Sequence, residues 1–66
     1  MTPKYPAIRV KLAGREGNAF AVLAHVLRAL RAAHVPQEEQ DAFGREAMSG
    51  DYDHLLRTCM EWVEVE

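Results

Sequence analysis

A single cysteine, Cys59, in a chain of 66 residues is the feature that most restricts how this protein can fold. A chain this short buries only about 60% of the surface that its unfolded form exposes, so small domains commonly gain stability from disulfides, metal ions or oligomerisation. One cysteine cannot form an intramolecular disulfide, and the lack of a Cys-x-x-Cys pair argues against the usual structural zinc site. We therefore expect one domain, residues 1–66, with no metal or cofactor, that forms a homo-oligomer, most simply a dimer.

The charge and hydropathy of the chain disfavour several classes of protein. The net charge is −2 and no cluster of Lys and Arg exceeds two adjacent positions, whereas nucleic-acid binders contact phosphates through a basic excess. Nucleic acid is therefore disfavoured as the main partner. No apolar run reaches about 18 residues, so we expect no membrane span. The first six residues lack the apolar core of a signal peptide, and a free cysteine suits a reducing compartment, so the expected location is the cytoplasm.

Both ends of the chain alternate between apolar and charged residues, which is the period of a strand with one buried face. The two segments are Tyr5–Leu12 and Trp62–Glu66, with Trp62 expected on the outer face of the second. Their outward charges are opposite in sign: Arg9 and Lys11 on the first segment, Glu64 and Glu66 on the second. Opposite charges stabilise neighbouring strands, so we expect these two strands to pair, within one chain or between two.

The segment Ala19–Ala33 consists mostly of strong helix formers, and Asn18 is a good N-cap for it. Its apolar residues form two adjacent stripes: Phe20, Leu23, Leu27 and Leu30 in one, and Val22, Val26, Ala29 and Ala33 in the other. The resulting arc is wider than the roughly 100° that one packed face needs. We therefore expect this helix to be buried on two sides, with the second side against another subunit.

Two further helices are expected between this segment and the second strand. One begins with Pro36 at its first position, runs to Met48, and ends at Gly50 as a left-handed terminator. The other is capped by Asp51. The residues expected to be buried are Phe43, Ala47 and Met48 in the former, and Tyr52, Leu55, Leu56, Cys59 and Met60 in the latter. The predicted fold is α+β, a small β-α-α-α-β domain whose two strands are covered by helices.

The loop Gly14-Arg15-Glu16-Gly17-Asn18 is the first candidate site, because it joins a strand to a helix N-terminus. Free N–H groups and the helix dipole favour an anion there, glycines allow close approach, and Arg15 could add a charge-assisted contact. The loop matches neither the P-loop nor the dinucleotide fingerprint. The alternative is a tight turn followed by an N-cap.

Three other groups of residues are candidates for ligand contacts. Asp51 and Tyr52 belong to a Ser-Gly-Asp-Tyr-Asp-His segment that could contact a polar ligand, although helix capping explains its acidic residues more simply. His25 and Arg28 lie on the face of the helix that carries Asn18, where they line a polar pocket or simply face solvent. Trp62 is either a stacking platform for a base or part of the core or an interface.

Catalysis finds little support in the sequence. Ser49 has no histidine base at a suggestive spacing, and no base partner for Thr58 is evident. Cys59 is expected to be buried and inert. The sequence therefore predicts that the protein is not an enzyme.

Four segments resemble a group of short, uncharacterised proteins of phages, prophages and bacterial genomes. They are Tyr5-Pro6 with the strand that follows, Gly17-Asn18-Ala19-Phe20, Ser49-Gly50-Asp51-Tyr52-Asp53-His54-Leu55-Leu56 and Trp62-Val63. His34 stands where this group would have glycine after the first helix. The resemblance implies a phage-type accessory role, since small phage proteins often counter host defences by binding a host protein or sequestering a nucleotide signal.

We therefore expect a non-enzymatic accessory protein that binds a small anionic, nucleotide-like ligand, as a sponge for a host defence signal would. The alternative is a protein-interaction module that inhibits or regulates a host protein. A convergent cavity with arginine and aromatic walls would favour the ligand, whereas an exposed apolar patch would favour the protein partner. The candidate ligand-binding residues are Gly14, Arg15, Gly17, Asn18, His25, Arg28, Asp51, Tyr52 and Trp62.

Overall fold

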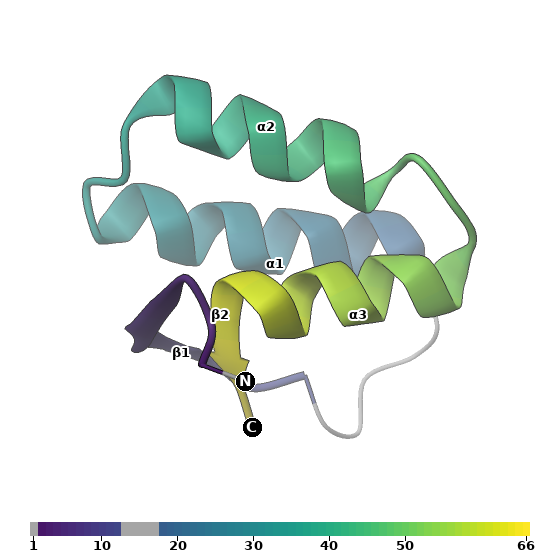
Figure 1. Cartoon of the computed structure of the whole chain (residues 1–66), viewed down its shortest axis with the longest axis horizontal. Helices are drawn as coiled ribbons and strands as arrows, with labels where there is room; N and C mark the ends of the chain where they lie inside the picture. Colours follow the sequence, from purple (N-terminus) through teal and green to yellow (C-terminus); the bar gives the residue numbers. More distant parts are fainter. Residues whose placement is uncertain (1, 13–17) are drawn as a thin grey trace.

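The computed structural model describes residues 2–12 and 18–66, and these form the predicted α+β domain. The order of elements is β-α-α-α-β, as the sequence predicted, and Figure 1 shows the three helices stacked beside the two strands. The bounds are β1 Tyr5–Val10, α1 Ala19–Ala32, α2 Gln37–Ala47, α3 Tyr52–Trp62 and β2 Val63–Val65.

The two strands pair in parallel within one chain, which confirms that they are neighbours. Their register places Arg9 opposite Glu64 and Val10 opposite Val65, with an irregularity between Tyr5 and Arg9. The predicted charge match is present, because the Arg9 guanidinium lies 3.7 Å from the Glu66 carboxylate. Both side chains are largely exposed, so we expect this ion pair to contribute little to stability.

The core forms where the helices meet the inner face of the sheet. Val22, Val26 and Leu30 recur every four residues on α1 and are buried, as are Phe43 of α2 and Leu55 of α3. The full set of buried apolar residues is Val10, Val22, Val26, Leu30, Val35, Phe43, Ala47, Leu55, Cys59 and Val63. This cluster joins both strands to all three helices, so the domain has one contiguous core.

Four residues that the sequence pattern assigned to buried stripes are exposed. Phe20 is 71% exposed, Met48 43% and Met60 54%, and Ala33 is also exposed. The stripe of α1 that contains Phe20 is therefore only half-covered, with Leu23 and Leu27 partly buried beside α2. Helical spacing shows which residues share a face, but the position of the neighbouring helix decides which part of a wide apolar face is covered.

The turn after α1 is a Schellman motif with a histidine in the left-handed position. His34 has φ 65°, its N–H donates to the Arg31 carbonyl (3.0 Å), and the Val35 N–H donates to the Leu30 carbonyl (3.1 Å). Glycine is the usual residue at this place. The buried Gln40 side chain donates from Nε2 to the Val35 carbonyl (3.0 Å), which fixes the turn against α2.

The ends of α2 differ from the prediction in two details. Pro36 is the N-cap, with ψ 146°, so the helix begins one residue later, at Gln37. Gly50 is not in the left-handed conformation, and Met48 is the C-cap with φ −96°. Glycine is needed at position 50 for another reason, because a Cβ atom there would lie 2.8 Å from the His54 ring.

Candidate functional site

Of the residues predicted for the glycine loop, Gly14, Arg15 and Gly17 lie outside the described residues. Asn18 is the N-cap of α1, as predicted, and its Oδ1 accepts hydrogen bonds from the N–H groups of Phe20 (2.9 Å) and Ala21 (3.2 Å). This side chain is therefore engaged with its own helix.

His25 and Arg28 lie on the exposed side of α1, away from the buried stripe.

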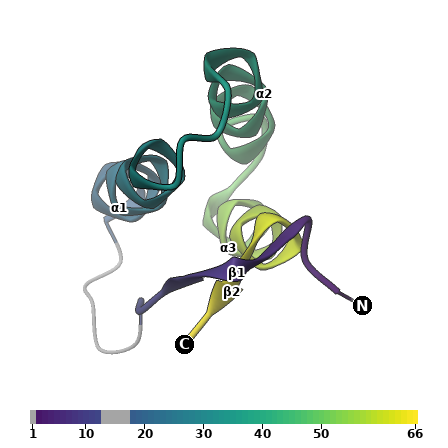
Figure 2. The same ribbon diagram turned by 90° about the vertical axis from the view of Figure 1, so that its left-hand side faces the viewer.

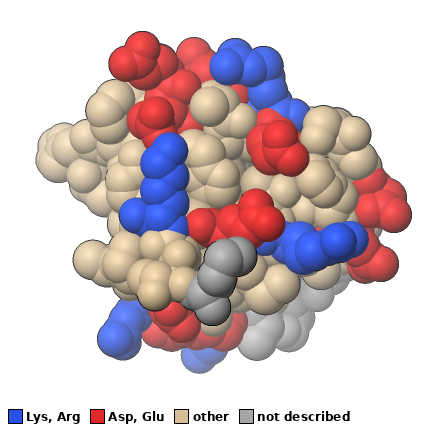
Figure 3. Space-filling view, in the orientation of Figure 1, with Lys and Arg blue, Asp and Glu red and all other residues tan. Residues whose placement is uncertain are grey.

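Acidic and basic side chains are interspersed over the face of the molecule in Figure 3. The described part of this face therefore has no extended basic surface of the kind that binds a nucleic-acid backbone.

Asp51 and Tyr52 have separate roles, although they are adjacent in the chain. Asp51 caps α3, since its Oδ1 accepts the N–H of His54 (2.9 Å). Tyr52 is half-buried and lines a groove of about 370 Å³ between α1, α3 and the end of the sheet. We call this the Tyr52 groove; its lining residues are Leu12, Val22, Tyr52, Leu56, Met60, Val65 and Glu66.

Trp62 lies elsewhere, and its predicted place on the outer face of a strand is wrong. The residue ends α3, and its ring packs edge-on against Phe43 (centroids 5.5 Å apart) and near Tyr5 (5.9 Å), with Lys4 Nζ 4.5 Å from the ring centroid. Tyr52 begins the same helix, and ten residues of helix span about 15 Å. The two aromatic rings therefore do not converge on one ligand.

An ion pair lies beside this aromatic cluster. Lys4 binds the Glu39 carboxylate, which also accepts a hydrogen bond from the Tyr5 hydroxyl (3.3 Å). The hydrogen bond to Glu39 raises the pKa of Lys4 above its ordinary value, and the hydrogen bond from Lys4 lowers the pKa of Glu39 below its own. These groups stabilise each other's charges at the edge of the core, and no described cationic group is left unpaired here for a ligand.

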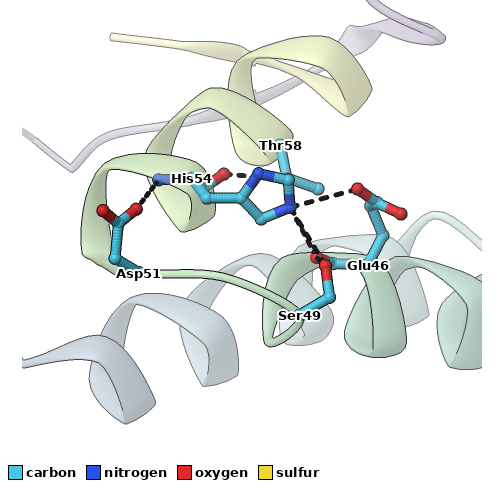
Figure 4. A network of polar contacts seen from close by, with 5 residues as sticks. All are labelled: Glu46, Ser49, Asp51, His54 and Thr58. Carbon is cyan, nitrogen blue, oxygen red and sulfur yellow. Dashed lines mark hydrogen bonds and ion pairs between the residues drawn. The ribbon is translucent and has the colours of Figure 1, made fainter.

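A polar network that the sequence did not reveal joins the end of α2 to the start of α3. Figure 4 shows His54 directed at Glu46 and Ser49. His54 Nε2 lies 2.9 Å from the Glu46 carbonyl oxygen, 3.0 Å from a Glu46 carboxylate oxygen and 3.2 Å from Ser49 Oγ. The prediction that Ser49 lacks a nearby histidine is therefore wrong. The five-residue separation gives no helical or strand periodicity, and the turn between the helices brings the pair together.

The geometry of this network differs from that of a catalytic triad. The Ser49 hydroxyl donates to the Glu46 carbonyl (2.7 Å), and both a carbonyl and a carboxylate oxygen face His54 Nε2. A ring nitrogen that faces two such acceptors can donate to them in the tautomer that carries its proton on Nε2. In a catalytic triad the serine and the carboxylate contact opposite ring nitrogens. Here both contact Nε2, and these contacts connect the end of α2 to the start of α3.

The remaining reactive side chains offer no site among the described residues. Cys59 is buried, and burial raises the pKa of its thiol to about 11, so it stays protonated near neutral pH. Within residues 2–12 and 18–66 no group of three or more His, Cys, Asp or Glu side chains is arranged to hold a metal ion. No helix in the same ranges has the length and apolar character needed to cross a membrane.

No protein family, curated protein or solved structure matches this chain. Among the described residues, the Tyr52 groove is the candidate site, and it is lined by one aromatic ring and several aliphatic side chains.

Proposed function

We propose that this protein is a non-enzymatic binding module that inhibits or regulates a partner protein, and that the Tyr52 groove receives an apolar side chain of that partner. The observation that carries this proposal is the composition of the groove. Six of its seven lining residues are aliphatic, aromatic or methionine, and Met60 is 54% exposed. Exposed apolar grooves with polar rims are typical of protein-binding surfaces.

The charge around the groove supports a protein partner over an anion. Glu66, which directly follows β2, is the charged residue that lines it. An anionic ligand would meet like charge, whereas a partner with a basic residue beside its apolar side chain would be attracted. Met60 also lines a second hollow of about 270 Å³ with Arg57 and Glu61, and its flexible thioether suits a surface that adapts to a partner.

A matched pair of surface variants tests this proposal. Met60→Glu places a charge in the groove, whereas Phe20→Glu places the same charge on another exposed apolar position, on α1. We expect a protein captured by the wild type to be retained by Phe20→Glu and lost by Met60→Glu. With that partner purified, titration should show at least about a tenfold weaker Kd for Met60→Glu, equivalent to about 1.4 kcal/mol. Equal binding by both variants would contradict the proposal.

A nucleotide-like ligand is the second candidate, favoured by one feature of the fold. Figure 1 shows α1 and α3 beginning at the same end of the molecule, and Tyr52 is the first residue of α3. The positive ends of two helix dipoles and an aromatic ring therefore lie near each other. Calorimetric titration against a panel of cyclic and linear nucleotides tests this. Arg15→Glu should abolish any binding while the circular dichroism spectrum stays unchanged, and no heat from any nucleotide rejects this candidate.

A further inference from the structure

The sulfur-containing side chains of the described residues differ sharply in exposure. Met48 is 43% exposed and Met60 is 54% exposed, whereas Cys59 is buried. Burial raises the pKa of the Cys59 thiol to about 11, so little of the reactive thiolate forms near neutral pH. Cys59 and Met60 are consecutive residues of α3, and they lie on different sides of this helix. The sulfur of α3 that an oxidant in solution can reach is therefore the Met60 thioether.

The Met60 side chain lies between two hollows of different character. On one side it lines the largely apolar Tyr52 groove. On the other side it lines a hollow of about 270 Å³ together with Thr2, Arg57 and Glu61, which we call the Arg57 hollow. Figure 2 looks along the helices and shows α1 on one side of α3 and the segment that precedes β1 on the other. Met60 therefore borders an apolar surface and a polar one.

We propose that Met60 is a reversible oxidation site, and that its sulfoxide weakens binding at the Tyr52 groove, an effect that rests on the function proposed above. The oxidant is hydrogen peroxide. The sulfur lone pair attacks one peroxide oxygen and the O–O bond breaks. The hydroxide that leaves takes up the proton of the transferred oxygen and forms water. Sulfur thus loses the two electrons that the peroxide gains, and methionine sulfoxide reductases reverse the change.

Oxidation changes which of the two hollows suits the Met60 side chain. A sulfoxide is polar and accepts hydrogen bonds, so contact with an aliphatic wall is unfavourable for it. Arg57 lies three residues before Met60 on α3, where side chains are neighbours, and its guanidinium is a hydrogen-bond donor. Oxidised Met60 should therefore leave the wall of the Tyr52 groove for the Arg57 hollow. An apolar side chain of a partner then loses the thioether against which it packs.

Met48 provides a matched control for Met60. Its side chain is also exposed, but it is the C-cap of α2 and does not line the Tyr52 groove. Leucine nearly conserves the volume of methionine and has no sulfur, so Met48→Leu and Met60→Leu should both fold. Each variant keeps one of the two exposed thioethers, which allows the effect of each oxidation to be measured by itself.

Tandem mass spectrometry after treatment of the native wild type with hydrogen peroxide tests whether Met60 is an oxidation site. Met60 and Met48 should each gain one oxygen atom, while Cys59 stays a thiol until the protein is unfolded in urea. Incubation with methionine sulfoxide reductases of both epimer specificities should remove the added oxygen. A Met60 side chain that stays reduced while Met48 is oxidised, or a Cys59 that reacts as fast as Met60, would overturn the proposal.

Methyl NMR spectra test the effect on the Tyr52 groove without any partner. In Met48→Leu, the methyl signals of Leu56 and Val65, which line the groove, should shift on oxidation and return after reduction. The same signals should stay in place in peroxide-treated Met60→Leu. Leu56 and Val65 signals that do not move in oxidised Met48→Leu would refute the predicted movement of Met60.

Titration with the purified partner tests the effect on binding. Oxidised Met48→Leu should bind at least about tenfold more weakly than the reduced form, whereas Met60→Leu should have the same Kd before and after peroxide treatment. An unchanged Kd for Met48→Leu would contradict the effect of oxidation on binding. If the reduced protein binds no partner, the proposed function fails, while the mass and methyl spectra still decide whether Met60 is oxidised and leaves the groove.

Discussion

Replacing His34 by glycine should make the protein more stable, although it removes a side chain. His34 has φ 65°, a region that costs a residue with a Cβ atom about 1–2 kcal/mol and glycine almost nothing. Glycine also increases the backbone freedom of the unfolded chain, which opposes the gain by about 0.4–1 kcal/mol. The expected net increase in the free energy of unfolding is about 0.5–1 kcal/mol.

This increase is large enough to measure as a shift in melting temperature. An unfolding entropy of about 2.1 cal/mol/K per residue gives about 0.14 kcal/mol/K for 66 residues. The predicted shift for His34→Gly is therefore about 4–7 °C upward, measured by circular dichroism at a fixed protein concentration.

Two variants separate the effect of backbone strain from that of the side chain. His34→Ala keeps the Cβ atom and should stay within about 0.5 kcal/mol of the wild type. Ala33→Gly, at the ordinary φ of −89°, relieves no strain and should lower the melting temperature. If His34→Gly melts no higher than His34→Ala, the inference of strain in the Schellman turn is refuted.

Four further predictions concern stability and reactivity. Asp51→Ala should lower the free energy of unfolding by about 1 kcal/mol in urea titrations, since it removes the cap of α3; unchanged stability would contradict a capping role. Phe43→Ala should cost about 3–5 kcal/mol and leave little folded protein by circular dichroism. The pKa of Glu39 is lowered in the folded protein by its hydrogen bond from Lys4. The ion pair therefore stabilises the fold at pH values above the unfolded carboxyl pKa, and this stabilisation is lost as pH falls through the lower folded pKa. Glu39→Gln and wild type should therefore differ in melting temperature near neutral pH and converge in acid. Cys59 should resist a thiol reagent at pH 8 in the native protein and react on unfolding; rapid native labelling would contradict its burial.

The elements could be predicted from the sequence because their signals are local. Asn18 and Asp51 cap helices through N–H groups two or three residues ahead, so the capping residue and its partners occupy one short segment. The alternation of β1 and the opposite charges of Arg9 and Glu66 likewise follow from strand geometry. Such features depend little on how the helices pack together.

The candidate site was harder to predict because it depends on tertiary packing. Trp62 has the spacing of either a helix end or a strand start, and in the structure α3 continues through it, with its ring packed against Phe43. Met60 shares the helical face of buried residues but lies where no other described element covers it. The contact between Ser49 and His54 arises from the angle between α2 and α3, which no spacing rule specifies.

The parallel pairing of β1 with β2 has a consequence for synthesis on the ribosome. Val10 and its partner Val65 are 55 positions apart (65 minus 10), and all three helices lie between them. The helices can form from local contacts as the chain emerges, but β1 has no partner strand until residues 63–65 have been made. During that interval the edge of β1 that pairs with β2 has backbone N–H and C=O groups without their partner strand. Nascent chains arrested before residue 63 should therefore be more prone to proteolysis and aggregation than the released protein.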